Sequence, residues 1–401
     1  MALHELFFLS LLILSGLAVF SVFFGYPLFL VLVAPFVRAG EGKEARGFQE
    51  AVSSVSILVI FRNPGTMVQE KIDNFLALDY PKEKLELVLV SDGSDDASTG
   101  IAESARSGQI KFHHFKEHVG KTNCINTGIS LCQGDIVLFS DVDAVIEPDV
   151  VERLCKHFRD PDVGGVCGQR VVGEKISGIA SGQMAFIRWD SVIKRLEDRA
   201  GLSLTAHDGK LYAIRKALFR TVPQGVTDDA YISLSVTGQG SRFAFDPRAF
   251  AFIKMPSRNT GHELSRRRRI VSTSLRGLWL NRRLFNPFKY GLFSMGLFVN
   301  KVVRRLIPFC LMGIFLASFG LASSGSIVFT LFLACQAAGY LLFLLYPGVI
   351  RRLDSRNPWV RRVRKIIGIG YFFCVGMGGT VLGVISFLSG EEITKWDPVK
   401  K

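Results

Sequence analysis

Long apolar runs interrupt an otherwise mixed chain at three places. No Asp, Glu, Lys or Arg occurs over residues 6–37, 306–350 or 366–390. Because about 20 apolar residues cross a bilayer, the first and third runs are each long enough for one span. The second run is long enough for two spans, with a break at the Ser/Gly stretch 323–326. The pattern predicts four transmembrane helices.

The first apolar run has an alternative interpretation as a cleaved signal peptide. The residues before it, MALHE, contain no Lys or Arg, and the run is longer than the apolar region of a signal peptide. Both features favour a transmembrane helix.

Between residues 52 and 254, apolar runs alternate with amphipathic segments. Four apolar runs predict strands, beginning at Val55, Leu85, Ile110 and Asp135. The segments between them predict helices over 67–77, 97–107 and 122–132. Short strands that alternate with helices are typical of a parallel sheet covered on both faces. Ligands of such sheets bind at the carboxyl ends of the strands.

These patterns divide the chain into five segments. They are an N-terminal membrane helix, a sheet domain, a basic amphipathic segment, three membrane helices and a tail, over 1–37, 38–260, 261–305, 306–390 and 391–401. In the third segment, Arg and Lys are interspersed with Leu, Trp, Phe and Val, which is typical of helices lying on a membrane surface.

Basic residues are concentrated near the apolar runs, and the formal net charge is +14. The loop between the last two predicted spans is strongly basic, with Arg351, Arg352, Arg356, Arg361, Arg362, Arg364 and Lys365. The positive-inside rule makes this loop cytoplasmic. Counting back, the sheet domain is cytoplasmic and both termini lie outside the plasma (inner) membrane. The position of the charges favours membrane lipids and phosphorylated substrates as partners, and no nucleic acid.

Carboxylates follow two of the predicted strands. Asp92 ends the second strand in SDGSDD, and Asp141 and Asp143 end the fourth in SDVDA. Carboxylates at positions i and i+2 of an extended chain lie on one face. Their oxygens are the preferred ligands of Mg²⁺ and Mn²⁺. Turns and helix caps are the alternative use of such residues.

Five motifs together resemble membrane-integrated glycosyltransferases of family 2. They are SDGS at Ser91, GKTNCINTG at Gly120, SDVDA at Ser140, TDDAY at Thr227 and SRRRRIV at Ser265. Each is common by chance, but their order, the predicted elements and the flanking apolar runs favour this family. The resemblance covers roughly residues 54–283 and includes polysaccharide synthases and lipid-linked sugar transferases. It implies an α/β fold of GT-A type (Rossmann-like), with a mostly parallel sheet domain combined with transmembrane α-helices.

The resemblance also implies a donor site for a nucleotide-diphosphate sugar, most commonly a UDP-sugar. Its donor-binding residues would be Asn63, Arg62, Asp92, Lys121, Asp141 and Arg269. Among these, Lys121 and Arg269 correspond to the residues that hold the diphosphate. Asp143, supported by Asp141, corresponds to the ligand of Mn²⁺ or Mg²⁺.

For catalysis, the resemblance implies an inverting hexosyl transfer with Asp229 as the general base. The neighbouring Asp228 is the open alternative for this role, and one of the two residues is expected to cap a helix over 230–237. His207 and Gly209 lie in the region that lines the acceptor side in the family. The acceptor would be lipid-linked or a glycan.

Two departures from the family pattern bear on function. The tyrosine-asparagine-glutamate of the first strand is replaced by Arg62, Asn63 and Pro64. Ile270 stands where polymer-forming relatives carry tryptophan. We therefore expect the addition of one or few sugars. A processive polysaccharide synthase and a non-catalytic basic membrane scaffold are the alternatives.

Overall fold

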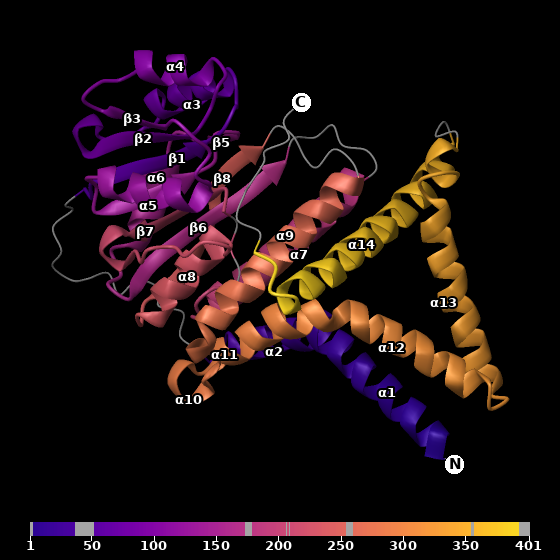
Figure 1. Ribbon diagram of the computed structural model, residues 1–401. Helices are drawn as coiled ribbons and strands as arrows, with labels where there is room; N and C mark the ends of the chain where they lie inside the picture. The colour runs from indigo at the N-terminus through magenta and orange to yellow at the C-terminus, as the bar shows by residue number, and fades with distance from the viewer. Residues whose placement is uncertain are drawn as a thin grey trace.

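The computed structural model describes residues 3–36, 52–172, 179–205, 207, 209–253, 260–353 and 357–392. A sheet domain lies on one side, and long helices extend away from it on the other (Figure 1).

The sheet domain is built on one mixed sheet of eight strands. Their bounds are β1 (Val55–Phe61), β2 (Leu85–Asp92), β3 (Ile110–Phe115), β4 (Ile136–Ser140), β5 (Ala144–Ile146), β6 (Val163–Val172), β7 (Leu211–Arg215) and β8 (Arg242–Ile253). The order is β3-β2-β1-β4-β7-β6-β8-β5. The four predicted strands β1 to β4 pair in parallel. Antiparallel pairs join β7 to β4 and β6, and β5 to β8, which the pattern did not predict.

Helices cover both faces of the sheet, as the alternation of elements predicted. On one face lie α3 (Met67–Leu76), α4 (Ser98–Ser104) and α6 (Val150–His157), and on the other α5 (Lys121–Leu131) and α8 (Asp228–Gly238). Along β1, Ile57 and Val59 pack toward the first group, whereas Leu58 and Ile60 pack toward the second. This period of two, with apolar residues on both faces, is typical of a buried parallel strand.

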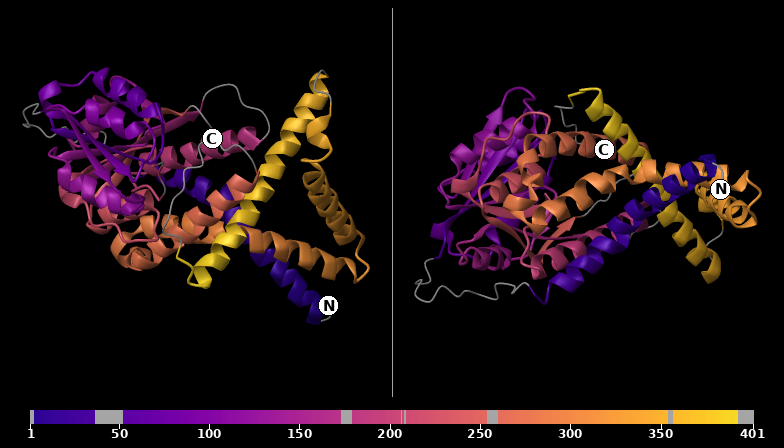
Figure 2. Two further views of the ribbon diagram at one scale, coloured as in Figure 1. Left: turned by 45° about the horizontal axis from the view of Figure 1, so that its top comes forward. Right: turned by 90° about the horizontal axis from the view of Figure 1, so that it is seen from below.

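Ten helical segments make up most of the rest of the chain. They are α1 (Leu3–Phe20), α2 (Tyr26–Val33), α7 (Ile179–Arg199), α9 (Thr260–Leu280), α10 (Pro287–Tyr290), α11 (Leu292–Leu297), η5 (Phe298–Val303), α12 (Arg304–Ala322), α13 (Ile327–Leu345) and α14 (Pro358–Leu388). In Figure 2, α1 and α12 run side by side. Close approach is possible because Gly313 faces Ser15 and Gly320 faces Phe8.

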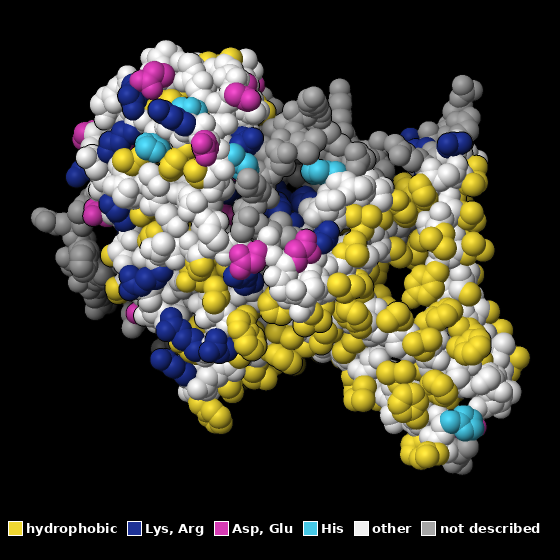
Figure 3. Space-filling view, viewed as in Figure 1, with side chains coloured by type: hydrophobic (Ala, Val, Ile, Leu, Met, Phe, Trp, Pro, Cys, Tyr) yellow, Lys and Arg dark blue, Asp and Glu magenta, His cyan; other side chains and the backbone are white. Residues whose placement is uncertain are grey.

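Four helical stretches are long and apolar enough to cross a membrane: Leu3–Val33, Leu292–Ala322, Ile327–Leu345 and Pro358–Leu388. Apolar side chains gather over these helices, and charged ones over the sheet domain (Figure 3). The expected fold class, a GT-A-type α/β domain combined with apolar helices, agrees with this arrangement. The second stretch begins at Leu292, inside the segment expected to lie on the membrane surface.

A buried polar cluster joins the first helix pair to the sheet domain. Glu197 of α7 is fully buried and accepts hydrogen bonds from Tyr26 Oη (2.7 Å) and Thr205 Oγ1 (2.6 Å). Asn300 of η5 donates to Thr205 Oγ1 at 2.7 Å. Burial raises the pKa of Glu197 to about 7. Buried polar groups in such a network fix the relative position of the elements that supply them.

The first residues of the C-terminal tail lie beside α9. Arg268 Nε donates to Ser386 Oγ at 2.8 Å, and ion pairs join Arg268 to Glu391 and Arg276 to Glu392. Since α9 packs on α8 of the sheet domain, a hydrocarbon core about 30 Å thick cannot separate Glu391 from that domain. The contact therefore favours the side of the sheet domain for Glu391 and Glu392, whereas the tail was expected on the opposite side.

This contact predicts the accessibility of three sites. If α12 and α13 both cross the membrane, the chain returns to the side of the sheet domain before α14, and α14, with both ends on that side, does not cross. With that domain inside the cell, Arg361→Cys and Glu391→Cys should be protected from an impermeant maleimide in intact cells. Ser324→Cys, between α12 and α13, should be labelled. Labelling of Glu391→Cys in intact cells, beyond the parent protein's own cysteines, would contradict the contact.

Candidate active site

Loops at the carboxyl ends of β1, β2 and β4 meet the start of β7 and the first turns of α5 and α8. The antiparallel register pairs Ser140 of β4 with Leu211 of β7. Continuing that register by one residue brings Asp141 opposite Lys210. Asp228 and Asp229 are the first two residues of α8, where the positive end of the helix dipole favours carboxylates.

Asp92 holds the loop that carries Lys121. Its carboxylate is fully buried, and Oδ1 accepts hydrogen bonds from Val119 N (2.8 Å) and Gly120 N (3.0 Å). His118 Nδ1 lies 2.9 Å from Oδ2. Gly120 has a φ of 89°, which glycine adopts without strain. Asp92 therefore positions the loop that carries Lys121, and its expected role in donor binding stays a prediction.

Arg62 and Asn63 lie next to the loop after β2. Arg62 Nη1 donates to Asp92 O at 3.2 Å, and Asp95 N donates to Asn63 Oδ1 at 2.9 Å. Asn63 has a φ of 45°, a left-handed conformation that asparagine tolerates better than most residues. These hydrogen bonds join the ends of β1 and β2 at the edge of the sheet where a donor nucleotide is expected.

Lys121 links the two groups of carboxylates. Its Nζ lies 3.0 Å from Asp228 Oδ2 and 3.5 Å from Asp141 Oδ1. Burial lowers the pKa of Lys121, but Asp141, Asp228 and Asp229 outweigh it, and the pKa is raised overall. The ammonium group is therefore charged, as a ligand for a diphosphate must be.

Asp141 and Asp143 share one cation, and that cation is Lys210. Its Nζ lies 2.6 Å from Asp141 Oδ2 and 2.9 Å from Asp143 Oδ1. A single positive centre therefore reaches both carboxylates, so the pair fits a divalent ion in position and in ligand chemistry. The described residues contain no group of three His, Cys, Asp or Glu side chains that would hold a metal alone.

Asp229 is half-buried, and charged or titratable side chains lie close to it. Burial and the charge of Asp228 raise the pKa of Asp229, against the opposing effects of His207 and Lys121. His207 Nε2 lies 2.8 Å from Asp229 O, and the His207 ring stacks on Phe243 at 4.8 Å. Asp229 Oδ1 also accepts from Ala230 N at 2.6 Å. The expected cap is not formed by either aspartate, because α8 already begins at Asp228 and Thr227 is its N-cap residue.

Gly209 leaves the space that the Asp229 side chain fills. A Cβ atom at residue 209 would collide with Asp229 Oδ2 and lie 3.0 Å from its Cγ. The structure thus brings together the candidate base with both residues expected on the acceptor side.

The four consecutive arginines of α9 interact with three different sets of partners. Arg266 and Arg267 pair with the buried Glu263, at 3.4 and 3.3 Å. Arg268 pairs with Glu391 instead. Burial lowers the pKa of Arg269, and Asp228 and Asp229 oppose this effect. Arg269 is thus the member of the run whose pKa responds to Asp228 and Asp229, and its expected role as a diphosphate ligand stays a prediction.

Sequence reasoning missed two lysines at this site. Lys210 stands directly before β7, and its role depends on the antiparallel pairing with β4. Lys71 of α3 is buried and donates to Ser140 Oγ and Ala144 O, both at 2.7 Å. Burial lowers the pKa of Lys71 to about 7, although Asp141 and Asp143 oppose it. An isolated lysine in an amphipathic helix gives no signal of such a position.

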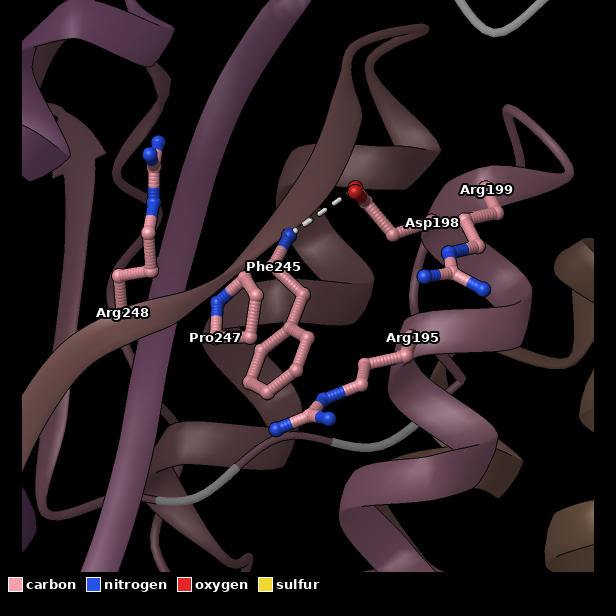
Figure 4. Close-up of a pocket in the computed structure, with 6 residues that line it drawn as sticks. All are labelled: Arg195, Asp198, Arg199, Phe245, Pro247 and Arg248. Atoms are coloured by element: carbon pink, nitrogen blue, oxygen red, sulfur yellow. Dashed lines mark hydrogen bonds between the residues drawn. The ribbon is translucent and has the colours of Figure 1, made fainter.

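A separate surface pocket lies between α7 and β8. It is lined by Arg195, Asp198, Arg199, Phe245, Pro247 and Arg248 (Figure 4). Asp198 Oδ1 accepts a hydrogen bond from Phe245 N at 3.1 Å. None of the candidate catalytic residues lines this pocket.

Comparison with known proteins supplies the class to which this geometry belongs. Residues 56–222 match the family described as Glycosyl transferase family 2. The chain is 25% identical over 216 residues to the poly-beta-1,6-N-acetyl-D-glucosamine synthase of Staphylococcus aureus, covering 52% of this chain and 51% of the relative. It is 25% identical over 222 residues to an N-acetylglucosaminyltransferase of Rhizobium leguminosarum bv. viciae, covering 51% and 52%. The chain thus spans about half the length of these curated relatives.

Among solved structures, the chain resembles a mannosyltransferase of Pyrobaculum calidifontis in complex with GDP-Man and Mn²⁺. The TM-score is 0.63 at 20% identity, over 97% of this chain and 100% of the other. This likeness confirms the GT-A fold together with the apolar helices. Residues 56–222 therefore carry the match to glycosyl transferase family 2, in agreement with the expected enzyme class.

The contact between Gly209 and Asp229 predicts a specific loss of activity. Gly209→Ala should push Asp229 out of place and lower glycosyl transfer by about 10²-fold, because small displacements of reacting groups are costly. Gly100→Ala is the matched control, since a Cβ atom there meets no other atom within 4 Å. Both variants should keep the same unfolding temperature in detergent. Full activity of the folded Gly209→Ala variant would contradict the assignment of Asp229 to the reacting position.

Proposed function

We propose that this protein transfers a sugar from a nucleotide-diphosphate donor to a membrane-associated acceptor, with inversion at the anomeric carbon. The observation that carries the proposal is the arrangement around Lys121, whose ammonium group lies between Asp141 of the DxD motif and Asp228 of the TDD motif. This arrangement would bring the donor phosphates, a cation and a general base close together. A UDP-sugar is the donor that we expect.

The leaving diphosphate would be stabilised by fixed positive charge. Lys121 and Arg269 would be the cations for it, since Lys121 lies 3.0 Å from Asp228 and the carboxylates of Asp228 and Asp229 favour the charged form of Arg269. Preorganised cations lower the barrier where charge develops in the transition state. Asp143 and Asp141 would hold Mn²⁺ or Mg²⁺, which when bound acts as a Lewis acid on the phosphate oxygens.

Asp229 would accept the proton of the attacking hydroxyl group. Its pKa is raised by burial and by Asp228, and a more basic carboxylate is a better proton acceptor near neutral pH. Direct attack by the hydroxyl group on the anomeric carbon, opposite the departing diphosphate, gives inversion. Gly209 and His207, beside Asp229, would line the path of the acceptor.

Cations near the apolar helices support a membrane-associated acceptor, lipid-linked or a glycan. Arg267 of α9 and Arg304 of α12 both lie over the ring of Phe186, at 5.1 and 5.0 Å from its centroid. Arg305 Nη2 donates to Ser274 Oγ of α9 at 2.5 Å. Basic residues at this level suit anionic headgroups of the inner (plasma) membrane, with the sheet domain in the cytoplasm and the N-terminus outside.

The primary test is the release of nucleoside diphosphate by the purified full chain. Incubation with Mn²⁺ or Mg²⁺ and a panel of nucleotide sugars should identify one donor that is turned over. Asp229→Asn should lower transfer by about 10²–10⁴-fold, as expected for loss of a general base, while donor binding persists. Asp149→Asn, at the start of α6, is the control. A folded Asp229→Asn variant with unchanged turnover would reject the assigned base, and no turnover of any donor would reject the function.

A processive polysaccharide synthase is the second candidate, and the resemblance to the Staphylococcus aureus synthase favours it. We favour the addition of one or few sugars because Ile270 replaces tryptophan in α9. An indole ring gives a sugar a flat apolar surface and a hydrogen-bond donor, whereas isoleucine gives neither.

Product length distinguishes these two candidates. Reconstituted protein with excess donor should give a product extended by one or few sugars in mass analysis. A ladder reaching high mass, formed without any other enzyme, would reject single addition and support the synthase.

A further inference from the structure

Lys210 stands at a position fixed by the sheet. Because β7 runs antiparallel to β4, with Ser140 opposite Leu211, the residue before β7 must lie against the residue after β4. Tyr212 and Phe139, one step further into the sheet, stack with their ring centroids 4.5 Å apart. The stem of Lys210 therefore starts from a rigid part of the domain.

The ammonium group of Lys210 bridges the two carboxylates that would hold a divalent ion. It contacts Oδ2 of Asp141 and Oδ1 of Asp143, one oxygen from each carboxylate. Lys121 is different, because it approaches the other oxygen of Asp141, at 3.5 Å, and lies closer to Asp228. Lys71 is held by Ser140 and by the Ala144 carbonyl. Of these three lysines, Lys210 is the one that bridges the two carboxylates.

We propose that Lys210 is a tethered cation that occupies the metal position between Asp141 and Asp143, and that a divalent ion binds there only by displacing it. The lysine stem has four flexible carbons and a compact charged end, which allows such a movement. The inference rests on the proposed donor site and adds a competitor within it.

Competition of this kind links the metal to the donor. Without nucleotide, Asp141 and Asp143 already share the charge of Lys210, and a divalent ion must displace this ammonium group to reach both carboxylates. A donor diphosphate brings further oxygen ligands for the ion and an anionic partner for the displaced ammonium group. The metal ion is therefore expected to bind the nucleotide-bound protein more tightly than the free protein. Likewise, the nucleotide is expected to bind the metal-bound protein more tightly.

The test is direct binding of Mn²⁺ to the purified full chain without nucleotide, followed by the electron paramagnetic resonance signal of free Mn²⁺. Lys210→Met should bind Mn²⁺ about ten-fold or more tightly than the unchanged protein, because a unit charge next to both carboxylates is removed. Lys210→Gln should show the same gain. Lys210→Arg keeps the cation and should stay near the unchanged protein.

Lys121→Met is the matched control, because it removes an equal charge beside Asp141 without opening the bridge. Its gain in Mn²⁺ affinity should be clearly smaller than that of Lys210→Met. Equal gains in Lys210→Met and Lys121→Met would overturn the inference. So would folded Lys210→Met and Lys210→Gln variants that bind Mn²⁺ no more tightly than the unchanged protein, or do not bind it. The titration contains no sugar donor, so its failure leaves the proposed transfer intact. Absence of turnover with every donor, beside a clear gain for Lys210→Met, would instead reject the transfer alone.

Discussion

Four carboxylates at one edge of the sheet impose the constraint on which this site depends. Asp141, Asp143, Asp228 and Asp229 repel one another in a partly buried region, so the folded chain must supply cations at the same place. It draws them from four separate elements: Lys71 from α3, Lys121 from α5, Lys210 from the start of β7 and Arg269 from α9. The order of strands and the direction of β7 are therefore requirements of the site, and not only of the hydrophobic core.

The same requirement ties the sheet domain to the apolar helices. Arg269 belongs to α9, and its neighbours Arg267 and Arg268 are held by Glu263 and by the end of α14. On the other side, Thr205 precedes His207 and shares the buried carboxylate of Glu197 with Tyr26 of α2. A shift of either helix relative to the sheet would thus move a residue next to Asp229. This coupling makes the helices part of the site's geometry as well as its anchor.

Much of this arrangement could be predicted from sequence. Buried parallel strands are continuous apolar runs, so β1 to β4 and the helices between them were found nearly residue by residue, and the DxD pair fell at the expected strand end. Lys210 could not be found in this way, because its place depends on an antiparallel pairing between strands 71 residues apart (211 minus 140). The arginine run was ambiguous for a similar reason. Four identical side chains in sequence reach different partners, and helical rotation of 100° per residue, with Glu263 and Ser386 on different sides, separates them.

The geometry also bears on the choice between the two adjacent aspartates, which motif order left open. Asp228 Oδ2 lies 3.0 Å from Lys121, and a carboxylate paired with an ammonium group is a weak proton acceptor. Asp229 points to Gly209, where the missing side chain leaves room, and burial raises its pKa. The pair therefore divides two tasks between neighbouring positions of one helix turn. In the proposed mechanism, Asp228 would keep Lys121 in place for the phosphates, and Asp229 would retain the basicity that proton transfer from a sugar hydroxyl requires.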